Sequence, residues 1–188
     1  MKKKVISYSL ITIFLILVVC GFIGIKTYVY PLEYKDEVLE YSQKYNLDPY
    51  LVFAVINAES GFDKHATSSK NARGLMQITE STAKEVNEIT NSVDSLDEEN
   101  IYNEDINIEL GCQYLASLIS RYNGNYYLAI CSYNAGIGNV DKWISQGQIT
   151  EELNTTNIEL PFKETTRYLK KVIHNYKMYK VIYPKLNE

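Results

Sequence analysis

The sequence predicts an all-α, single-domain protein whose globular part follows an N-terminal transmembrane helix. Residues 5–25 form an uncharged apolar run, and several later segments repeat apolar or aromatic residues with helical spacing. Alternating strand patterns are scarce, and the best is a small β-hairpin near residues 72–78. Of the 188 residues, 46% are hydrophobic and 22% are charged. This composition excludes a disordered tail, and the length suits one domain.

The N-terminal run is long enough to cross a bilayer, which takes about 20 apolar residues in a helix. Lys2, Lys3 and Lys4 precede it and favour a cytoplasmic N-terminus. A cleaved signal peptide is the alternative, but its apolar region usually spans only about 7–15 residues, and we find no small-residue cleavage motif after the run. We therefore expect a single-pass anchor in the cell membrane with the body outside the cytoplasm. Under the alternative, the body is secreted.

The sequence predicts five segments. These are a cytoplasmic stub (residues 1–4), the anchor or signal sequence (5–25), a linker (26–33), the globular domain (34–183) and a tail (184–188). Beyond residue 26 the chain carries 15 basic and 23 acidic residues. The body is therefore acidic and shows no basic stripe in the sequence, which argues against nucleic acid as a partner.

The first two helices of the body are separated by a clear break. Residues 34–45 carry apolar or aromatic side chains at a 4-3-4 spacing, which fits one helical face. Asp48 is a good N-cap and Pro49 suits the first helical position. The second helix should run from there to about Ser60, and Gly61 is a natural stop.

Three further helices are expected. Residues 108–122 form an apolar stripe that ends at Asn123-Gly124. Residues 127–133 are almost wholly apolar, which predicts a short, buried central helix. Residues 162–183 form a long final helix, and residues 153–160 before it are expected to form a surface loop.

The cysteines and histidines predict no metal site. Cys20 lies in the apolar run, whereas Cys112 and Cys131 occupy positions typical of small buried helix residues. An exported body permits a disulfide between them, but buried free thiols are the favoured interpretation. His65 and His174 are isolated and lack metal-ligand spacing. No metal or other cofactor is expected.

One carboxyl interrupts an apolar helix face. Leu51, Val55 and Glu59 are spaced four apart, so Glu59 projects from the side that faces the core. It also lies in the last turn, where the helix dipole disfavours a negative charge. Both effects raise its pKa above the usual value of about 4.3. Such a carboxyl suits a general acid, although a buried Glu satisfied by hydrogen bonds, or a frayed helix end, fits the same pattern.

Five blocks around this residue resemble the signature of the soluble lytic transglycosylase catalytic domain, a lysozyme-like helical fold. The blocks are Glu59-Ser60-Gly61-Phe62, Ala72-Arg73-Gly74-Leu75-Met76-Gln77-Ile78, Asn107-Ile108 with Gly111 and Tyr114-Leu115, Ser132-Tyr133-Asn134-Ala135-Gly136, and Leu160-Pro161-Phe162-Lys163-Glu164-Thr165 with Tyr168. They stand in family order and cover roughly residues 34–179. Any one block is a weak match, but five in order are a strong one.

The resemblance implies a reaction on peptidoglycan. Glu59 matches the catalytic acid, which protonates the oxygen between N-acetylmuramic acid and N-acetylglucosamine and then, ionised, takes the proton of the muramic 6-hydroxyl. The product is a 1,6-anhydro end. No second carboxylate is evident beside Glu59, because Asp63 is expected in an exposed loop. A hydrolytic lysozyme of the same fold and a non-catalytic glycan-binding module are the alternatives.

The remaining matched positions are expected to bind the glycan. They are Ser60, Met76, Gln77, Tyr133, Asn134, Glu164 and Tyr168. Backbone binding is an equal alternative for Ser60. Core packing is the default for Met76 taken alone and the alternative for Tyr168. Glu164 equally suits the favourable first turn of a helix. The expected partners are peptidoglycan strands, the membrane through the N-terminal helix, and cell-envelope machinery.

Overall fold

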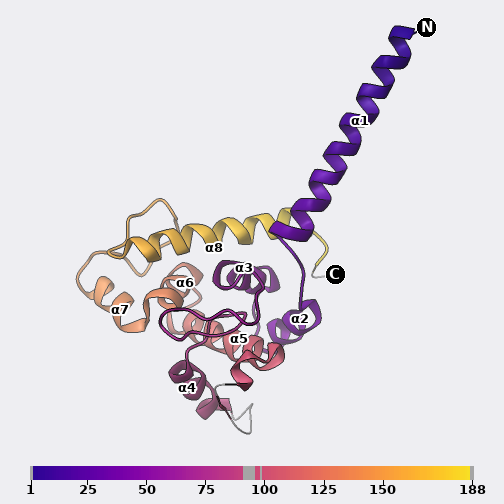
Figure 1. The fold of residues 1–188 in the computed structure, drawn as a ribbon. Helices are drawn as coiled ribbons and strands as arrows, with labels where there is room; N and C mark the ends of the chain where they lie inside the picture. Colours follow the sequence, from indigo (N-terminus) through magenta and orange to yellow (C-terminus); the bar gives the residue numbers. More distant parts are fainter. Residues whose placement is uncertain (1, 91–95, 98, 187–188) are drawn as a thin grey trace. The chain divides into compact units, whose positions relative to one another are not determined.

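A computed structural model describes residues 2–90, 96–97 and 99–186 (Figure 1). The chain forms two compact units, Met1–Glu33 and Tyr34–Glu188. The first unit is one helical rod, and the second holds the packed helices. Each unit is described by itself.

The N-terminal unit consists of α1 (Lys2–Gly24), which continues into a wider π-helical turn, Ile25–Val29. The stretch Ile11–Val29 is long and apolar enough to cross a membrane. Its large side chains, such as Phe14 and Leu17, are exposed. This unit therefore buries little apolar surface within itself, as a lipid-facing helix would.

The second unit is built from helices, which confirms the all-α prediction. They are α2 (Lys35–Lys44), α3 (Pro49–Glu59), α4 (Glu80–Thr90), α5 (Glu104–Arg121), α6 (Tyr126–Ala135), α7 (Ile137–Ser145) and α8 (Lys163–Ile182), with a 3-10 turn at Asn100–Tyr102. In place of the expected hairpin, isolated bridges pair Arg73 with Thr67 and with Ile78. The sequence analysis did not anticipate α4 and α7.

Helix α3 lies at the centre of the core. Residues 50–56 are all buried, and the helix packs along α8 and beside α2. Helix α6 packs against both α5 and α8, and its residues 128–132 are buried, as predicted for a central element. The three helices that carry Glu59, Tyr133 and Tyr168, namely α3, α6 and α8, are thus held by core packing.

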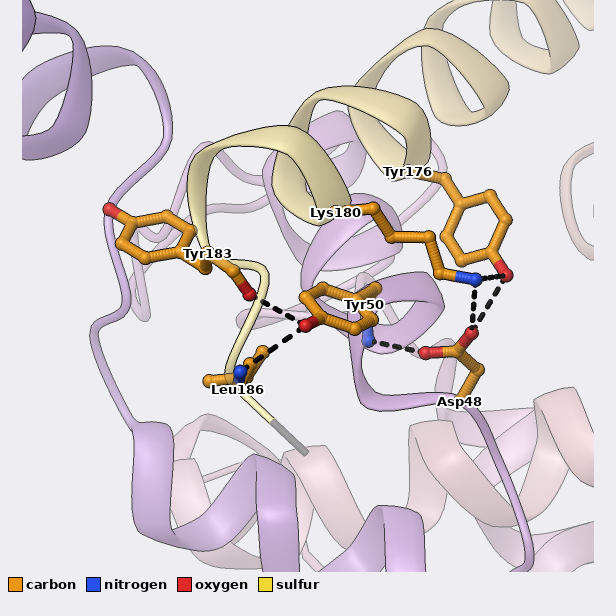
Figure 2. Close-up of polar contacts among 6 residues, drawn as sticks. All are labelled: Asp48, Tyr50, Tyr176, Lys180, Tyr183 and Leu186. Carbon is orange, nitrogen blue, oxygen red and sulfur yellow. Dashed lines mark hydrogen bonds and ion pairs between the residues drawn. The ribbon is translucent and has the colours of Figure 1, made fainter. Parts of the chain in front are cut away.

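Helices α3 and α8 run in opposite directions, and a polar cluster joins the start of α3 to the end of α8 (Figure 2). The Asp48 carboxylate accepts a 3.0 Å hydrogen bond from the Tyr50 backbone N–H, which is the predicted N-cap. It also accepts from the Tyr176 hydroxyl at 2.7 Å and pairs with Lys180 at 3.0 Å. The Tyr50 hydroxyl donates to the Tyr183 carbonyl at 2.6 Å. This cluster fixes the alignment of the two helices.

Replacing Asp48 with Ala should therefore destabilise the domain. The change removes the N-cap and both contacts to α8, and we expect a loss of about 1–2 kcal/mol in the free energy of unfolding. Urea unfolding of the full chain in detergent, followed by helical circular dichroism, measures it. Asp36→Ala, which removes an exposed first-turn acid of α2, is the matched control. Equal midpoints for the two variants would show that the cluster contributes nothing.

Candidate active site

Glu59 is the last residue of α3, and it lies where the core helix reaches the surface. The turn that follows is set by Gly61, whose φ of 61° lies in the left-handed region. The Glu59 carboxylate accepts a 2.6 Å hydrogen bond from the Tyr168 hydroxyl of α8. Glu59 keeps partial exposure. The carboxyl is therefore largely desolvated and still reachable by a ligand.

Burial raises the pKa of Glu59 to about 7. The hydrogen bond from Tyr168 and the positive charge of Lys171 act in the opposite direction, and the negative charge of Glu164 adds to the rise. Desolvation outweighs the two stabilising neighbours because it disfavours the charged form directly. At neutral pH, protonated and ionised forms of this carboxyl are both well populated, as general acid–base chemistry requires.

Two residues of α8 hold the end of α3. Burial, together with the adjacent Glu59 charge, raises the pKa of Tyr168 well above its ordinary value, so its hydroxyl remains a donor. One turn later, the Lys171 ammonium donates a 2.8 Å hydrogen bond to the Ala58 carbonyl. A cation is favourable there because the last carbonyls of a helix carry partial negative charge. The sequence analysis missed Lys171, since it lies 113 positions from its partner.

Removing the Lys171 charge should raise the pKa of Glu59 further. Lys171→Met deletes a charge that favours the ionised carboxyl, so the titration of Glu59 shifts to higher pH. Carbon-13 NMR of the labelled side-chain carboxyl measures the shift. Lys170→Met is the matched control, because the Lys170 ammonium pairs with Glu159 at 3.2 Å. A Glu59 titration that moves equally in both variants would refute a specific role for Lys171.

Tyr133 of α6 links the site to the loop before α4. Its hydroxyl donates a 2.8 Å hydrogen bond to the Met76 carbonyl, and its ring packs on Tyr114 with centroids 5.2 Å apart. Burial raises the pKa of Tyr133 well above its ordinary value, with the nearby Glu59 charge as the next cause. Tyr133 therefore lies close enough to interact with the acid electrostatically, while its hydroxyl is bound to the loop.

The same loop is tied to α5 by Asn107, which is fully buried. Its side-chain oxygen accepts a 2.7 Å bond from the Met76 backbone N–H, and its amide nitrogen donates to the carbonyls of Arg73 and Ile101 at 3.0 and 2.8 Å. Gly74 adopts a φ of 72°, and a Cβ at that position would overlap the Asn107 amide. Asn107 belongs to a matched block, but the sequence assigned it no role.

Ser60 and Met76 are bound within the protein. The Ser60 hydroxyl donates to the Ile56 carbonyl at 3.3 Å and accepts from the Phe62 backbone N–H at 3.1 Å. The Met76 side chain is fully buried, and it packs so closely on α5 that a Cβ at Gly111 would overlap it. These are the backbone-binding and core-packing alternatives that the sequence left open for the two residues.

Gln77 and Asn134 also have partners within the domain. The Gln77 amide donates to the carbonyls of Ala66 and Gly74, both at 3.0 Å, with a backbone φ of 51°. The Asn134 side-chain oxygen accepts a 2.7 Å bond from the Thr165 hydroxyl. Asn134 is partly exposed, and its contact with Thr165 joins α6 to α8.

The other nearby acids differ from Glu59 in their surroundings. Glu164 is exposed in the first turn of α8, and its charge reaches Glu59. Asp63 is exposed, as expected, and its carboxylate accepts from the His65 backbone N–H at 2.9 Å. Glu59 is thus a desolvated carboxyl flanked by solvated acids.

Among the described residues, no group of three or more His, Cys, Asp or Glu side chains lies close enough together to bind a metal ion. Cys112 and Cys131 are both free and buried, which matches the favoured interpretation of buried thiols. Burial raises the pKa of both thiols. The two cysteines therefore behave as small apolar core residues.

A concavity of about 1070 Å³ lies at the opposite end of α6 from Tyr133. It is lined by residues of the α5–α6 turn, of α7 and of the loop that includes Leu153. None of the side chains predicted to bind glycan lines this concavity. The chemistry of the site therefore centres on the junction of α3, α6 and α8.

The fold and the site define a class of protein: an all-α domain with a single desolvated carboxyl at the end of its central helix, held by a tyrosine from its last helix. The chain belongs to the transglycosylase SLT domain family, whose family model matches residues 36–156. The match contains Glu59, the 72–78 loop and α6. It stops before α8.

Curated relatives extend the similarity beyond that match. The chain is 30% identical over 172 residues to the membrane-bound lytic murein transglycosylase C of Edwardsiella ictaluri, which covers 80% of this chain and 47% of the relative. It is 30% identical over 146 residues to the soluble lytic murein transglycosylase of Salmonella typhimurium, covering 77% of this chain and 22% of the relative. The chain thus spans less than half the length of either relative.

Solved structures show the same architecture. The lytic transglycosylase Slt of Pseudomonas aeruginosa, determined as an inactive mutant, aligns with a TM-score of 0.71 at 27% identity over 84% of this chain and 25% of that one. The 70 kDa soluble lytic transglycosylase of Escherichia coli aligns with a TM-score of 0.72 at 24% identity, over 81% and 25% of the respective chains. The lysozyme-like helical fold expected from the resemblance is confirmed.

Proposed function

We propose that this chain is a membrane-anchored peptidoglycan lytic transglycosylase in which Glu59 acts first as general acid and then as general base. The observation that carries the proposal is the desolvated Glu59 carboxyl, with a pKa of about 7 and a hydrogen bond from Tyr168. The names of the relatives support the substrate and the reaction class.

The reaction needs two proton transfers at one carboxyl. Protonated Glu59 donates its proton to the oxygen that links N-acetylmuramic acid to N-acetylglucosamine, and the bond from that oxygen to the muramic anomeric carbon breaks. The resulting carboxylate then removes the proton of the muramic 6-hydroxyl, whose oxygen bonds to the same anomeric carbon. The 1,6-anhydro ring forms, Glu59 is protonated again and no water is consumed. A pKa near the working pH serves both steps.

The neighbouring acids favour the lyase over a hydrolytic lysozyme. Retaining and inverting glycosidases use a pair of carboxyl groups, the second acting as nucleophile or as base for water. Glu164 and Asp63 are both exposed, unlike Glu59, and this proposal assigns neither of them to attack on the anomeric carbon. An internal nucleophile, the substrate's own hydroxyl, needs no such partner.

The other predicted residues divide into two roles in this proposal. Asn134, Glu164 and Tyr168 are proposed to contact the glycan. Tyr168 donates to the Glu59 carboxylate, Glu164 is exposed in the first turn of the same helix, and Asn134 accepts from the adjacent Thr165. The second group is proposed to shape the site by fixing the end of α3 and the 72–78 loop; it consists of Ser60, Met76, Gln77 and Tyr133. The side chains of Ser60, Gln77 and Tyr133 are hydrogen-bonded to backbone atoms, and that of Met76 is buried in the core.

The N-terminal helix is proposed to anchor the enzyme. The stretch Ile11–Val29 has the length and apolarity of a spanning helix, and a membrane-bound relative supports this location. Lys2, Lys3 and Lys4 lie at the start of the helix, before its apolar run. They favour a cytoplasmic N-terminus, and the catalytic domain is accordingly proposed to lie outside the cytoplasm, where peptidoglycan is found.

Mass spectrometry of digested peptidoglycan tests the proposed reaction. The full chain in detergent is incubated with purified sacculi, and the released muropeptides are analysed without chemical reduction. The proposal predicts anhydro-muramyl ends, one water lighter than hydrolysis products. Hydrated reducing ends would identify a lysozyme instead, and bound but uncleaved glycan would identify a binding module.

A further inference from the structure

The exposed face of α8 carries a row of basic side chains. Lys163, Arg167, Lys170, His174 and Lys177 follow one another at spacings of four, three, four and three, and all are exposed. This spacing places them on a single helical face, which spans roughly 20 Å along the helix axis. The row faces solvent, whereas Tyr168 and Tyr179 are buried on the side that faces α3.

The charge of α8 is opposite to that of the remaining body. The helix contains six Lys or Arg residues and one Glu, and the other residues after position 26 contain nine basic and 22 acidic residues. The prediction that the body has no basic stripe is therefore wrong for this face of α8. The row becomes evident only once the bounds and phase of α8 assign these residues to one exposed face.

Most of the row is available to a partner. Lys163, Arg167 and Lys177 form no ion pair or hydrogen bond with any residue that the structure describes. Lys170 pairs only with the exposed Glu159, an interaction that contributes little. One turn beyond Lys177, the Val181 side chain is 72% exposed. An extended basic row with an apolar residue at its end suits an anionic surface with an apolar interior.

We propose that the exposed face of α8 binds the anionic lipid headgroups of the membrane in which the N-terminal helix is anchored. Charge complementarity selects a phosphate-bearing surface, and the short tether selects the bilayer. Only residues 30–34 separate the N-terminal helical rod from α2, and five extended residues reach at most about 18 Å. The domain is therefore held beside the bilayer, where each basic residue strengthens attraction to an anionic leaflet by roughly fivefold.

This inference rests on the proposed membrane anchor but not on the proposed chemistry. Glu59 is held by Tyr168, a buried residue of the same helix, so docking through the exposed face of α8 would fix the orientation of the site relative to the bilayer. Cleavage would then occur at a fixed orientation to the membrane surface.

A fluorescent probe on α8 tests the docking in the full chain. Val181→Cys, in a Cys20→Ser background, is labelled with an environment-sensitive fluorophore, since the two remaining cysteines are buried. The protein is reconstituted into nanodiscs of phosphatidylcholine alone or of an equimolar mixture with phosphatidylglycerol. Co-elution with the discs is measured first, and failure at this step would refute the anchor rather than the docking.

We expect a blue-shifted, brighter probe only in the discs that contain phosphatidylglycerol, and a loss of this signal at high salt. The variant Lys163→Gln/Arg167→Gln/Lys177→Gln should lower the docking equilibrium roughly 100-fold. The control Lys70→Gln/Lys84→Gln/Lys142→Gln removes the same charge from exposed sites outside α8 and should leave the signal unchanged. Identical spectra in both lipids, equal loss in both variants, or binding to soluble anionic wall polymer in preference to the mixed-lipid discs would overturn the proposal.

Discussion

Replacing Glu59 with Gln should lower the rate of peptidoglycan cleavage by roughly 10²–10⁴-fold, the usual contribution of a general acid–base group. The amide nearly matches the carboxyl in size and still accepts the hydrogen bond from Tyr168, but it neither donates a proton to the glycosidic oxygen nor removes one from the 6-hydroxyl. Because no second carboxyl with a similar environment adjoins it among the described residues, no other residue takes over the role.

The control for this variant is Asp63→Asn, which removes an exposed carboxylate four positions along the chain. Its activity should remain close to that of the unmodified enzyme. Muropeptide release from sacculi gives the rates, and helical circular dichroism shows that both variants are folded. Substantial cleavage by the Glu59→Gln variant would remove this residue from the mechanism and leave only the family membership.

Tyr168→Phe should have the second largest effect, a loss of roughly 10- to 100-fold in the rate of cleavage at neutral pH, because hydrogen bonds to charged groups contribute about 1.5–3 kcal/mol. The change deletes the 2.6 Å bond that orients the Glu59 carboxylate and favours its ionised form. The acid step then suffers most, because it generates the carboxylate that this hydroxyl stabilises.

The sign of the pH effect follows from the same contact. The hydroxyl of Tyr168 lowers the pKa of Glu59, so its removal raises that pKa, and protonated Glu59 persists to higher pH. The alkaline limb of the activity profile, where the general acid loses its proton, should therefore move to higher pH. Tyr176→Phe, at the far end of α8 and bonded to Asp48, is the control. If the alkaline limb of the Tyr168→Phe variant stays in place or moves to lower pH, the proposed role of Tyr168 is contradicted.

Local sequence rules predicted the parts of the site that depend on one helix. The cap at Asp48, the first-turn Pro49 and the stop at Gly61 define α3, and the four-residue spacing from Leu51 through Val55 placed Glu59 on the buried face. Capping and periodicity depend on residues that are only a few positions apart in the sequence. They can therefore be predicted from a single sequence.

Contacts across the fold were not predictable in this way. Lys171 meets Ala58 and Asn107 meets Met76 only because the helices pack as they do. The side chains of Ser60 and Gln77 likewise form hydrogen bonds with backbone atoms of the protein. Nothing in the local pattern distinguishes a side chain that binds its own backbone from one that binds a sugar.

Helices α4 and α7 were not predicted, although both sequences are amphipathic. Ala83 and Val86 are the buried residues within the part of α4 whose side chains are described, and Val140 and Trp143 are those of α7. Both helices are short, and each places only these few side chains in the core. They pack against α5 and α6, respectively.

The pH titration of the Glu59 carboxyl, followed by carbon-13 NMR in the unmodified full chain, tests most directly whether one group serves as both acid and base. A midpoint near pH 7 is the predicted result. A midpoint in the ordinary range for glutamate, about 4–4.5, would mean that Glu59 is fully ionised at neutral pH and cannot donate the first proton.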